Sequence, residues 1–240
     1  VSDESIFREV DEEVRAEQFR RLWKNYGSYI SGAAIGVVLA VAGIKGWQYY
    51  QKQQAESAGE QYLSAASLLS SGKKAEADKI FADLAENGPA GFSALAKFRL
   101  AAELAKAGSN AEALKAFDEI GSAGGVDAAL QNLAKIRAAL LAADTESLEA
   151  IEKRVSPLNT PEGAWRHSAR EILAISAYKN GDLVKADRLY NELASDAATP
   201  AGLRQRATLM IGVISPKLPS GAKDAAPAKK NETPETGSTQ

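Results

Sequence analysis

The chain lacks the residues from which most metal sites and many catalytic sites are built. Its 240 residues include no cysteine and a single histidine. Without cysteine there is no disulfide framework and no thiol chemistry, although the chain remains compatible with an oxidising compartment. The one histidine, His167, has no second histidine or cysteine with which to form a metal site or a nucleophilic triad. We expect His167 to lie on a helix surface, and we predict no catalytic, metal-binding or cofactor-binding residue.

A charge excess of one sign and a phosphate-binding loop are missing as well. The 29 basic and 31 acidic residues give a net charge of −2, which provides no basic field for nucleic acid. Gly72-Lys73 has no earlier glycine at the spacing of a phosphate loop, and no G-x-G-x-x-G motif follows a strand. The composition therefore favours neither nucleic-acid binding nor an enzyme.

One long hydrophobic run is present, and it contains no charged residue. It extends from Asn25 to Ile44 and reads NYGSYISGAAIGVVLAVAGI. About 20 helical residues at about 1.5 Å each span about 30 Å, the thickness of the hydrocarbon core of a bilayer. Aromatic residues, which favour the headgroup region, lie at both ends of the run: Tyr26, Tyr29, Trp47, Tyr49 and Tyr50. We predict a transmembrane helix over residues 25–44.

The cations that flank this run predict its orientation. The preceding residues contain Arg8, Arg15, Arg20, Arg21 and Lys24, whereas only Lys45 and Lys52 follow closely. Basic residues near a membrane span are enriched on the cytoplasmic side. We therefore expect residues 1–24 to be cytoplasmic and everything from about Lys45 onward to lie across the membrane.

Two other interpretations of the run are open. The core helix of a soluble protein can be equally apolar, but the flanking cations and aromatics at both ends disfavour it. A cleaved signal peptide is the sharper rival, because Ala40-Val41-Ala42 has the small-x-small form of a cleavage site. The residues before the run are rich in acids, however, where a signal peptide has a short basic start. A retained anchor is the favoured interpretation.

The two ends of the chain differ from its middle. Residues 1–24 are highly charged, with Ile6, Phe7, Val10 and Val14 at helical spacing, which predicts a short amphipathic helix. It could lie on the membrane or a partner, or simply be solvated. Residues 215–240 combine several prolines with small and polar residues, so we expect a disordered tail.

Between these ends the chain carries an internal repeat. The segments GKKAEADKIFADL, GSNAEALKAFDEI and GDLVKADRLYNEL follow Gly72, Gly108 and Gly181. In each copy the same positions before and after the glycine hold alanine, an aromatic residue, and leucine or isoleucine: Ala65, Ala77, Phe81 and Leu84; Ala101, Ala113, Phe117 and Ile120; Ala174, Ala186, Tyr190 and Leu193. The spacing of the first two glycines resembles the tetratricopeptide repeat, a helical hairpin of about 34 residues.

The repeat predicts an all-α solenoid over residues 45–214. Alanines let the two helices of a hairpin approach closely, the aromatic residue fills the space toward the next hairpin, and the glycine makes a left-handed turn. The hairpin expected within residues 127–155 lacks the signature spacing and is degenerate. Residues 201–214 have no following helix, so we expect them to form the terminal cap that a solenoid requires.

A stripe of small residues lies within the predicted membrane helix. Ser28, Gly32, Gly36 and Ala40 recur every four residues and include a G-x-x-x-G motif. Such a face allows another transmembrane helix to approach closely, although glycine and alanine are also common in membrane helices generally. We predict these four residues as a candidate transmembrane packing face.

The chain as a whole resembles the YfgM-type ancillary subunits of the Sec translocon. The resemblance covers about residues 3–214 and is most specific in NGDLVKADRLYNEL and the later TPAGLR segment. It implies a bacterial inner-membrane protein with a periplasmic tetratricopeptide-like domain. It also implies association with Sec translocon subunits and with a membrane-anchored periplasmic isomerase or chaperone, and a role in handling unfolded exported polypeptides. A generic envelope scaffold for cell-division or outer-membrane assembly factors is the alternative, because one fold serves many partners.

The repeat alignment also predicts which side chains face a binding groove. If partners bind along the first helix of each hairpin, positions ten and two residues before each aligned glycine should face them. These positions are Tyr62, Ser70, Phe98, Lys106, Glu171 and Lys179. The aromatics would serve as apolar anchors and the lysines would meet carboxylates or carbonyls. Alternatively, Tyr62 and Phe98 only fill gaps between hairpins.

Overall fold

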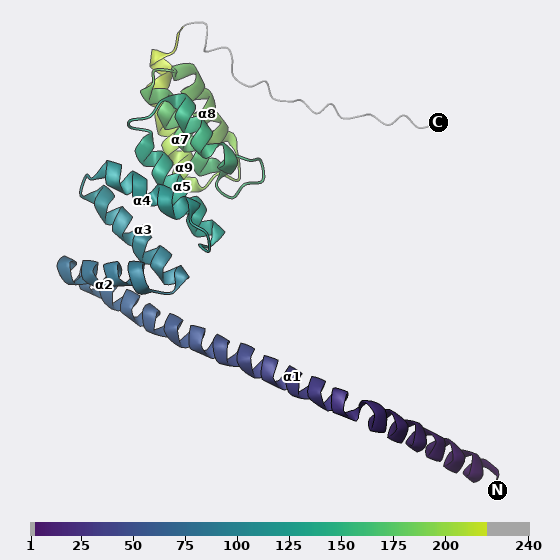
Figure 1. Cartoon of the computed structure of the whole chain (residues 1–240). Coiled ribbons are helices and arrows are strands. Elements are labelled where there is room, and N and C mark those ends of the chain that lie inside the picture. The colour runs from purple at the N-terminus through teal and green to yellow at the C-terminus, as the bar shows by residue number, and fades with distance from the viewer. Residues whose placement is uncertain (1–2, 220–240) are drawn as a thin grey trace, which may run out of the picture. The chain divides into compact units, whose positions relative to one another are not determined.

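Every regular element that the structure describes is helical, which confirms the predicted all-α fold (Figure 1). The computed structural model describes residues 3–219, without the side chains of residues 3–23, Asn25, Ile30 and Ala34. The elements in chain order are α1 (Asp3–Ser70), α2 (Lys74–Asn87), α3 (Ala90–Lys106), α4 (Asn110–Ser122), α5 (Ala128–Ala142), α6 (Leu148–Val155), the 3-10 turn η1 (Ser156–Leu158), α7 (Arg166–Lys179), α8 (Leu183–Ser195), α9 (Ala201–Ile214) and the 3-10 turn η2 (Ser215–Lys217).

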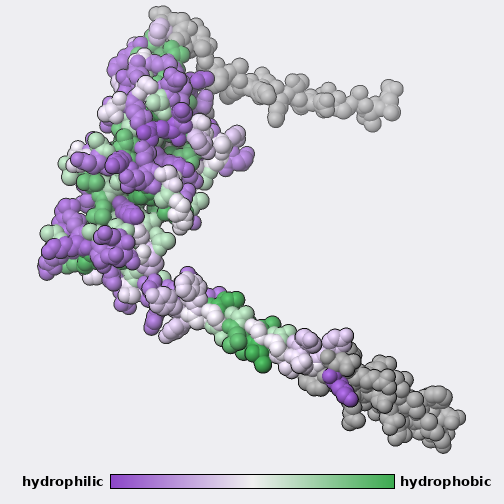
Figure 2. All heavy atoms as spheres, in the orientation of Figure 1, coloured by the Kyte–Doolittle hydropathy of each residue, from purple (hydrophilic) through white to green (hydrophobic). Residues whose placement is uncertain are grey.

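The first compact unit of the chain, residues 1–60, contains the apolar part of α1. This part is long and apolar enough to cross a membrane, and its side chains are exposed, with Val38 and Leu39 each 66% accessible. Figure 2 shows it as a green band along the helix. One candidate membrane span near the N-terminus is therefore present, as the sequence predicted. The amphipathic pattern predicted for residues 1–24 falls on side chains outside the described set.

The second unit, residues 61–240, contains the helical hairpins. It begins at Gln61, and residues 45–60 group with the apolar helix. Near the end of α1, Tyr62 packs against Phe81 of α2. Helix α3 pairs with α4, α5 with α6, and α7 with α8, and α9 packs on α8. The described residues thus form four hairpins and a closing helix.

Glycines end the first helix of three hairpins, as predicted. Gly72, Gly108 and Gly181 have φ angles of +80°, +83° and +81°. Each lies in a Schellman arrangement; for example, the Gly108 N–H donates to the Ala105 carbonyl and the Ser109 N–H donates to the Leu104 carbonyl. Because side chains other than hydrogen strain this left-handed conformation, glycine sets the tight turns at 71–73, 107–109 and 180–182.

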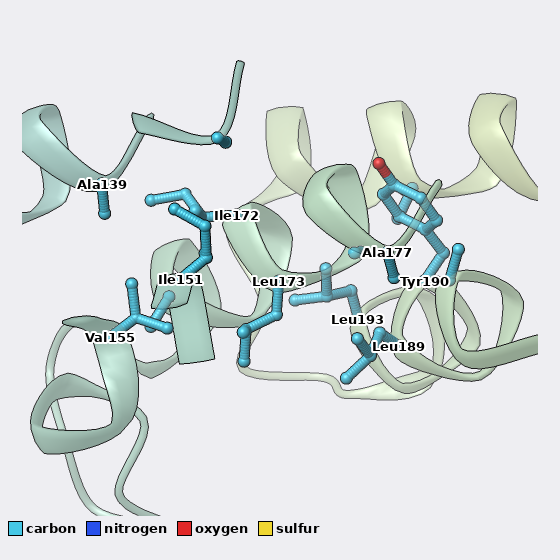
Figure 3. Packing of buried hydrophobic residues seen from close by; sticks show 14 of the residues in the cluster. Ala139, Ile151, Val155, Ile172, Leu173, Ala177, Leu189, Tyr190 and Leu193 are labelled. Atoms are coloured by element: carbon cyan, nitrogen blue, oxygen red, sulfur yellow. The ribbon is translucent and has the colours of Figure 1, made fainter. Parts of the chain in front are cut away.

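The repeated alanines and aromatics form the core between the helices. All six aligned alanines are fully buried, and Phe81, Phe117 and Tyr190 are at most 2% exposed. In the second hairpin, Ala101, Ala113, Phe117 and Ile120 form one cluster with Ala134 and Ala138 of α5. Figure 3 shows the corresponding layer around α7 and α8, with Ala177, Tyr190 and Leu193 among its members. The repeat alignment therefore identified core residues correctly.

The third hairpin departs from the others, as its sequence indicated. Its turn has no left-handed glycine and is longer, covering residues 143–147, and α6 has only 8 residues. Helix α6 nevertheless packs on the core, because its Ile151 and Val155 side chains are completely buried. Arg154 then links two elements, donating to Glu146 at 2.7 Å and to Asp118 of α4 at 2.9 Å. An ion-pair network thus supports this hairpin in place of the repeat signature.

Two predictions are wrong in detail. His167 is buried, at 6% exposure, and its Nε2 lies 2.8 Å from the Asp196 carboxylate, 29 residues further along the chain. The predicted disordered tail begins too early, because Ser215–Lys217 form η2 and Leu218 packs against the core. Leu218 is apolar and Lys217 donates to the Tyr178 hydroxyl, so these residues stay on the domain. Residues 220–240 lie outside the described range.

Truncating the aromatic core position gives a test of this packing. We expect Phe117→Ala to lower the free energy of unfolding by about 3 to 5 kcal/mol, because it leaves a cavity in a fully buried cluster. Trp165→Ala should cost less, since Trp165 is only partly buried against the core. Urea unfolding followed by circular dichroism would measure both. Equal and small losses would contradict the repeat alignment.

Candidate protein-binding groove

A cavity of about 540 Å³ lies along the first helices of three consecutive hairpins. We call it the first-helix groove. Its walls come from the end of α1, from α3 and from α5, with one residue of α4. The lining residues are Tyr62, Leu95, Phe98, Arg99, Ala102, Ala105, Lys106, Phe117, Arg137, Leu140 and Leu141. The structure thus brings together three of the residues that the sequence proposed: Tyr62, Phe98 and Lys106.

The two predicted aromatics also pack against core rings. Tyr62 meets Phe81 edge-on, with ring centroids 5.3 Å apart, and Phe98 meets Phe117 in the same manner at 5.0 Å. Both side chains are partly buried. Edge-to-face contacts of this kind stabilise aromatic pairs beyond their burial. Tyr62 and Phe98 therefore fill gaps between helices and also present a surface to the groove.

Basic side chains surround the apolar floor. Arg99, Lys106 and Arg137 line the groove, and no acidic residue is among its lining residues. Glu103 lies beside two of these cations, at 3.3 Å from Arg99 and 3.0 Å from Lys106, and it also accepts from Lys74 at 2.9 Å. Hydrogen bonds from Lys74 and Lys106 lower the pKa of the Glu103 carboxyl from 4.5 to about 2.

The other three predicted groove residues lie elsewhere. Ser70 is exposed near the end of α1 and donates its hydroxyl to the Ser67 carbonyl at 2.7 Å. Glu171 of α7 accepts from Arg206 of α9 at 2.8 Å, and Lys179 of α7 pairs with Asp144. These two ion pairs join α7 to its neighbours. Binding roles for all six residues remain predictions.

The small residues predicted as a packing face lie on the exposed surface of the apolar helix. Ser28, Gly32, Gly36 and Ala40 are exposed, and a methyl group added at Gly32 or Gly36 would meet nothing within 4 Å. Their role as a transmembrane packing face remains a prediction.

Sequence reasoning missed part of the groove. Leu95 and Arg99 of α3 lie one turn apart, and Arg137, Leu140 and Leu141 share one face of α5 at helical spacing. That spacing could have indicated them. The residues of α5 were missed because the alignment counted back from glycines, and the turn of the third hairpin has no left-handed glycine from which to count.

A second cavity, of about 460 Å³, lies on the opposite face of α3. It runs between α3, α4 and the loop that follows, and its charged lining residues, Lys97 and Glu119, have opposite signs. None of the residues that the sequence proposed for binding lines it. We therefore take the first-helix groove as the candidate site.

No cluster in the described part of the chain is suited to hold a metal ion. The His167–Asp196 pair, of which His167 is buried and Asp196 is partly exposed, instead ties the start of α7 to the end of α8, and the Asp196 carboxylate also accepts from the Ala198 N–H at 2.8 Å. The hydrogen bond from His167 lowers the pKa of Asp196. The contact between α7 and α8 therefore explains this pair.

Comparison with known protein families decides the classification. Residues 20–210 match the tetratricopeptide repeat-like domain, and the match includes the apolar span as well as all four hairpins. The chain belongs to this family. Neither the curated proteins nor the solved structures include a significant match. Tetratricopeptide-like folds are interaction scaffolds and are typically non-enzymatic, and no catalytic family is indicated. The family therefore indicates a role in protein–protein interaction.

The pKa of Glu103 predicts how the stability of the domain depends on pH. Because the folded-state pKa is lowered, the stabilising effect of Glu103 is present above about pH 4.5 and is lost as the pH falls toward about 2. Glu103→Gln removes this contribution. The melting temperature of the wild type should fall more steeply between about pH 6 and pH 2.5 than that of the variant.

Other acids lose their ion pairs equally in both proteins, so the difference between the two curves isolates Glu103. Parallel curves would show that the Glu103 network contributes no pH-dependent stability.

Proposed function

We propose that this chain is a membrane-anchored periplasmic subunit that associates with the Sec translocon and helps newly exported chains reach periplasmic chaperones. In this proposal α1 crosses the bacterial inner membrane once, with residues 1–24 in the cytoplasm and the hairpin domain in the periplasm. The partners are translocon subunits, a membrane-anchored periplasmic isomerase or chaperone, and unfolded exported polypeptides. The chain catalyses no reaction.

One observation supports the binding role above the others. The first-helix groove combines exposed apolar side chains with hydrogen-bond donors on the face that the repeat alignment proposed. Leu95 and Leu140 are 39% and 41% exposed, and both line the groove. An apolar surface flanked by donors fits an extended or partly folded polypeptide, whose backbone carbonyls need partners.

The location rests on the apolar span and its flanking charges. The apolar part of α1 supports a single-pass anchor. The excess of cations before it supports a cytoplasmic N-terminal segment. The association with the translocon rests on the resemblance to YfgM-type subunits.

Site-specific crosslinking in intact cells tests this proposal. A photoreactive residue at Arg137, in the groove, should capture translocon subunits, the isomerase or exported chains. The same residue at Arg188, exposed on α8 outside the groove, should not. Leu95→Ser with Leu140→Ser should reduce the Arg137 crosslinks about tenfold, because two apolar anchors are lost.

The matched control replaces Leu63 and Leu209, which are 69% and 65% exposed outside the groove, by serine. These changes should leave the crosslinks unchanged. A cysteine at Ser238 should react with an impermeant thiol reagent in spheroplasts if the domain is periplasmic. Equal crosslinking in both double variants would reject the groove. Exclusive capture of cell-wall or outer-membrane assembly factors would favour the envelope scaffold.

A further inference from the structure

The apolar floor of the first-helix groove can receive hydrophobic side chains. Phe98 lies against Phe117, and Leu95 and Leu140 remain substantially exposed on α3 and α5. These leucines are close enough to line one cavity. The floor alone does not distinguish one hydrophobic segment from another, so any selectivity must come from the charges beside it.

All the charged side chains that line the groove are cationic. They come from two different hairpins, with Arg99 and Lys106 on α3 and Arg137 on α5. A segment that crosses from α3 to α5 therefore meets positive charge on both sides. Such a surface attracts carboxylates and repels lysine and arginine.

Glu103 neutralises part of this charge but not all of it. Its carboxylate is shared among Lys74, Arg99 and Lys106, and its side chain is only 14% exposed. Lys74 also pairs with Asp78 at 3.6 Å, so Glu103 is left to face the two groove cations Arg99 and Lys106, and it offers little surface to an incoming cation. Arg137 is exposed and takes part in none of the ion pairs found among the described residues. The groove retains a positive surplus, centred on the side where Arg137 lies.

The last full hairpin provides a contrast. Its two predicted groove positions, Glu171 and Lys179, have opposite charges, and each is paired within the fold. No comparable surplus arises there. The charge preference therefore belongs to the first three hairpins.

We propose that the first-helix groove selects polypeptide segments in which hydrophobic residues lie next to acidic residues. This inference rests on the proposed function, because it assigns the kind of segment that the binding groove prefers. Leu95, Phe98 and Leu140 receive the hydrophobic side chains, and Arg137, Arg99 and Lys106 meet the carboxylates. Basic segments bind weakly at this site.

Fluorescence anisotropy with the full-length chain in detergent micelles tests the preference. The probe is a short fluorescein-labelled peptide containing Leu-Ser-Phe-Ser-Glu-Glu, compared with twins that end in Gln-Gln or Lys-Lys. The wild type should bind the Glu-Glu peptide about threefold to tenfold more tightly than the Gln-Gln peptide, as expected for two or three exposed ion pairs. The difference should shrink at high salt, which screens exposed charges.

Two variants should move the affinity in opposite directions. Arg137→Gln should weaken binding of the Glu-Glu peptide about threefold and leave the Gln-Gln peptide unaffected. Glu103→Gln should strengthen Glu-Glu binding, because it frees Arg99 and Lys106. If either replacement unfolded the domain, that variant would bind the Glu-Glu peptide more weakly. Changes of affinity in opposite directions therefore exclude unfolding as their common cause. Arg188→Gln, the same change at an exposed arginine outside the groove, should have no effect.

The outcomes separate this inference from the proposed function. If all three peptides bind equally and Leu95→Ser with Leu140→Ser abolishes binding, the groove binds polypeptide but the acidic preference is wrong. Tighter binding of the Lys-Lys peptide would also overturn the preference. If the leucine replacements affect no peptide, the groove is not the binding surface, and both proposals fail.

Discussion

Close contact between alanine-faced helices is the interaction on which this domain depends. Ala101 of α3 and Ala113 of α4 are completely buried within one cluster, and equivalent alanines are buried in the first and fourth hairpins. Small side chains allow two helix backbones to approach closely. As a result, Phe117, which lies one turn after Ala113, extends beyond the two backbones toward the next hairpin. Phe117 thereby contacts α3 and clusters with alanines of α5. Stacking follows from a local contact repeated along the chain.

The groove is a consequence of that stacking. Because the alanines occupy the hairpin interfaces, larger residues on another face of the first helices have no helix to cover them. Leu95, Leu140 and Arg137 lie there, and the described chain leaves them exposed. A surface of this kind suits a protein whose partners are other polypeptides, and the tetratricopeptide repeat-like classification agrees with it. The apolar span of α1 is long and apolar enough to cross a membrane.

The sequence predicted those parts of the structure that depend on local patterns. Gly72, Gly108 and Gly181 set the turns, and the residues counted from them proved to be core. Contacts between distant residues could not be predicted in this way. His167 was expected at the surface because its partner, Asp196, lies 29 residues later in the chain. Arg137 and Leu140 were missed because the third hairpin lacks the glycine that defines the register, while Tyr62, Phe98 and Lys106 were found through it.

The most direct test of this account compares two alanines on the same helix. Ala113 is fully buried in the hairpin interface, whereas Ala111, two residues earlier in α4, is exposed. Replacing each by leucine and measuring the free energy of unfolding in urea separates close helix packing from helix propensity. The account predicts that Ala113→Leu lowers the free energy of unfolding by about 1 to 3 kcal/mol through overpacking. It predicts that Ala111→Leu changes it by no more than about 0.5 kcal/mol. Equal effects at the two positions would contradict the claim that close alanine contact holds the hairpins together.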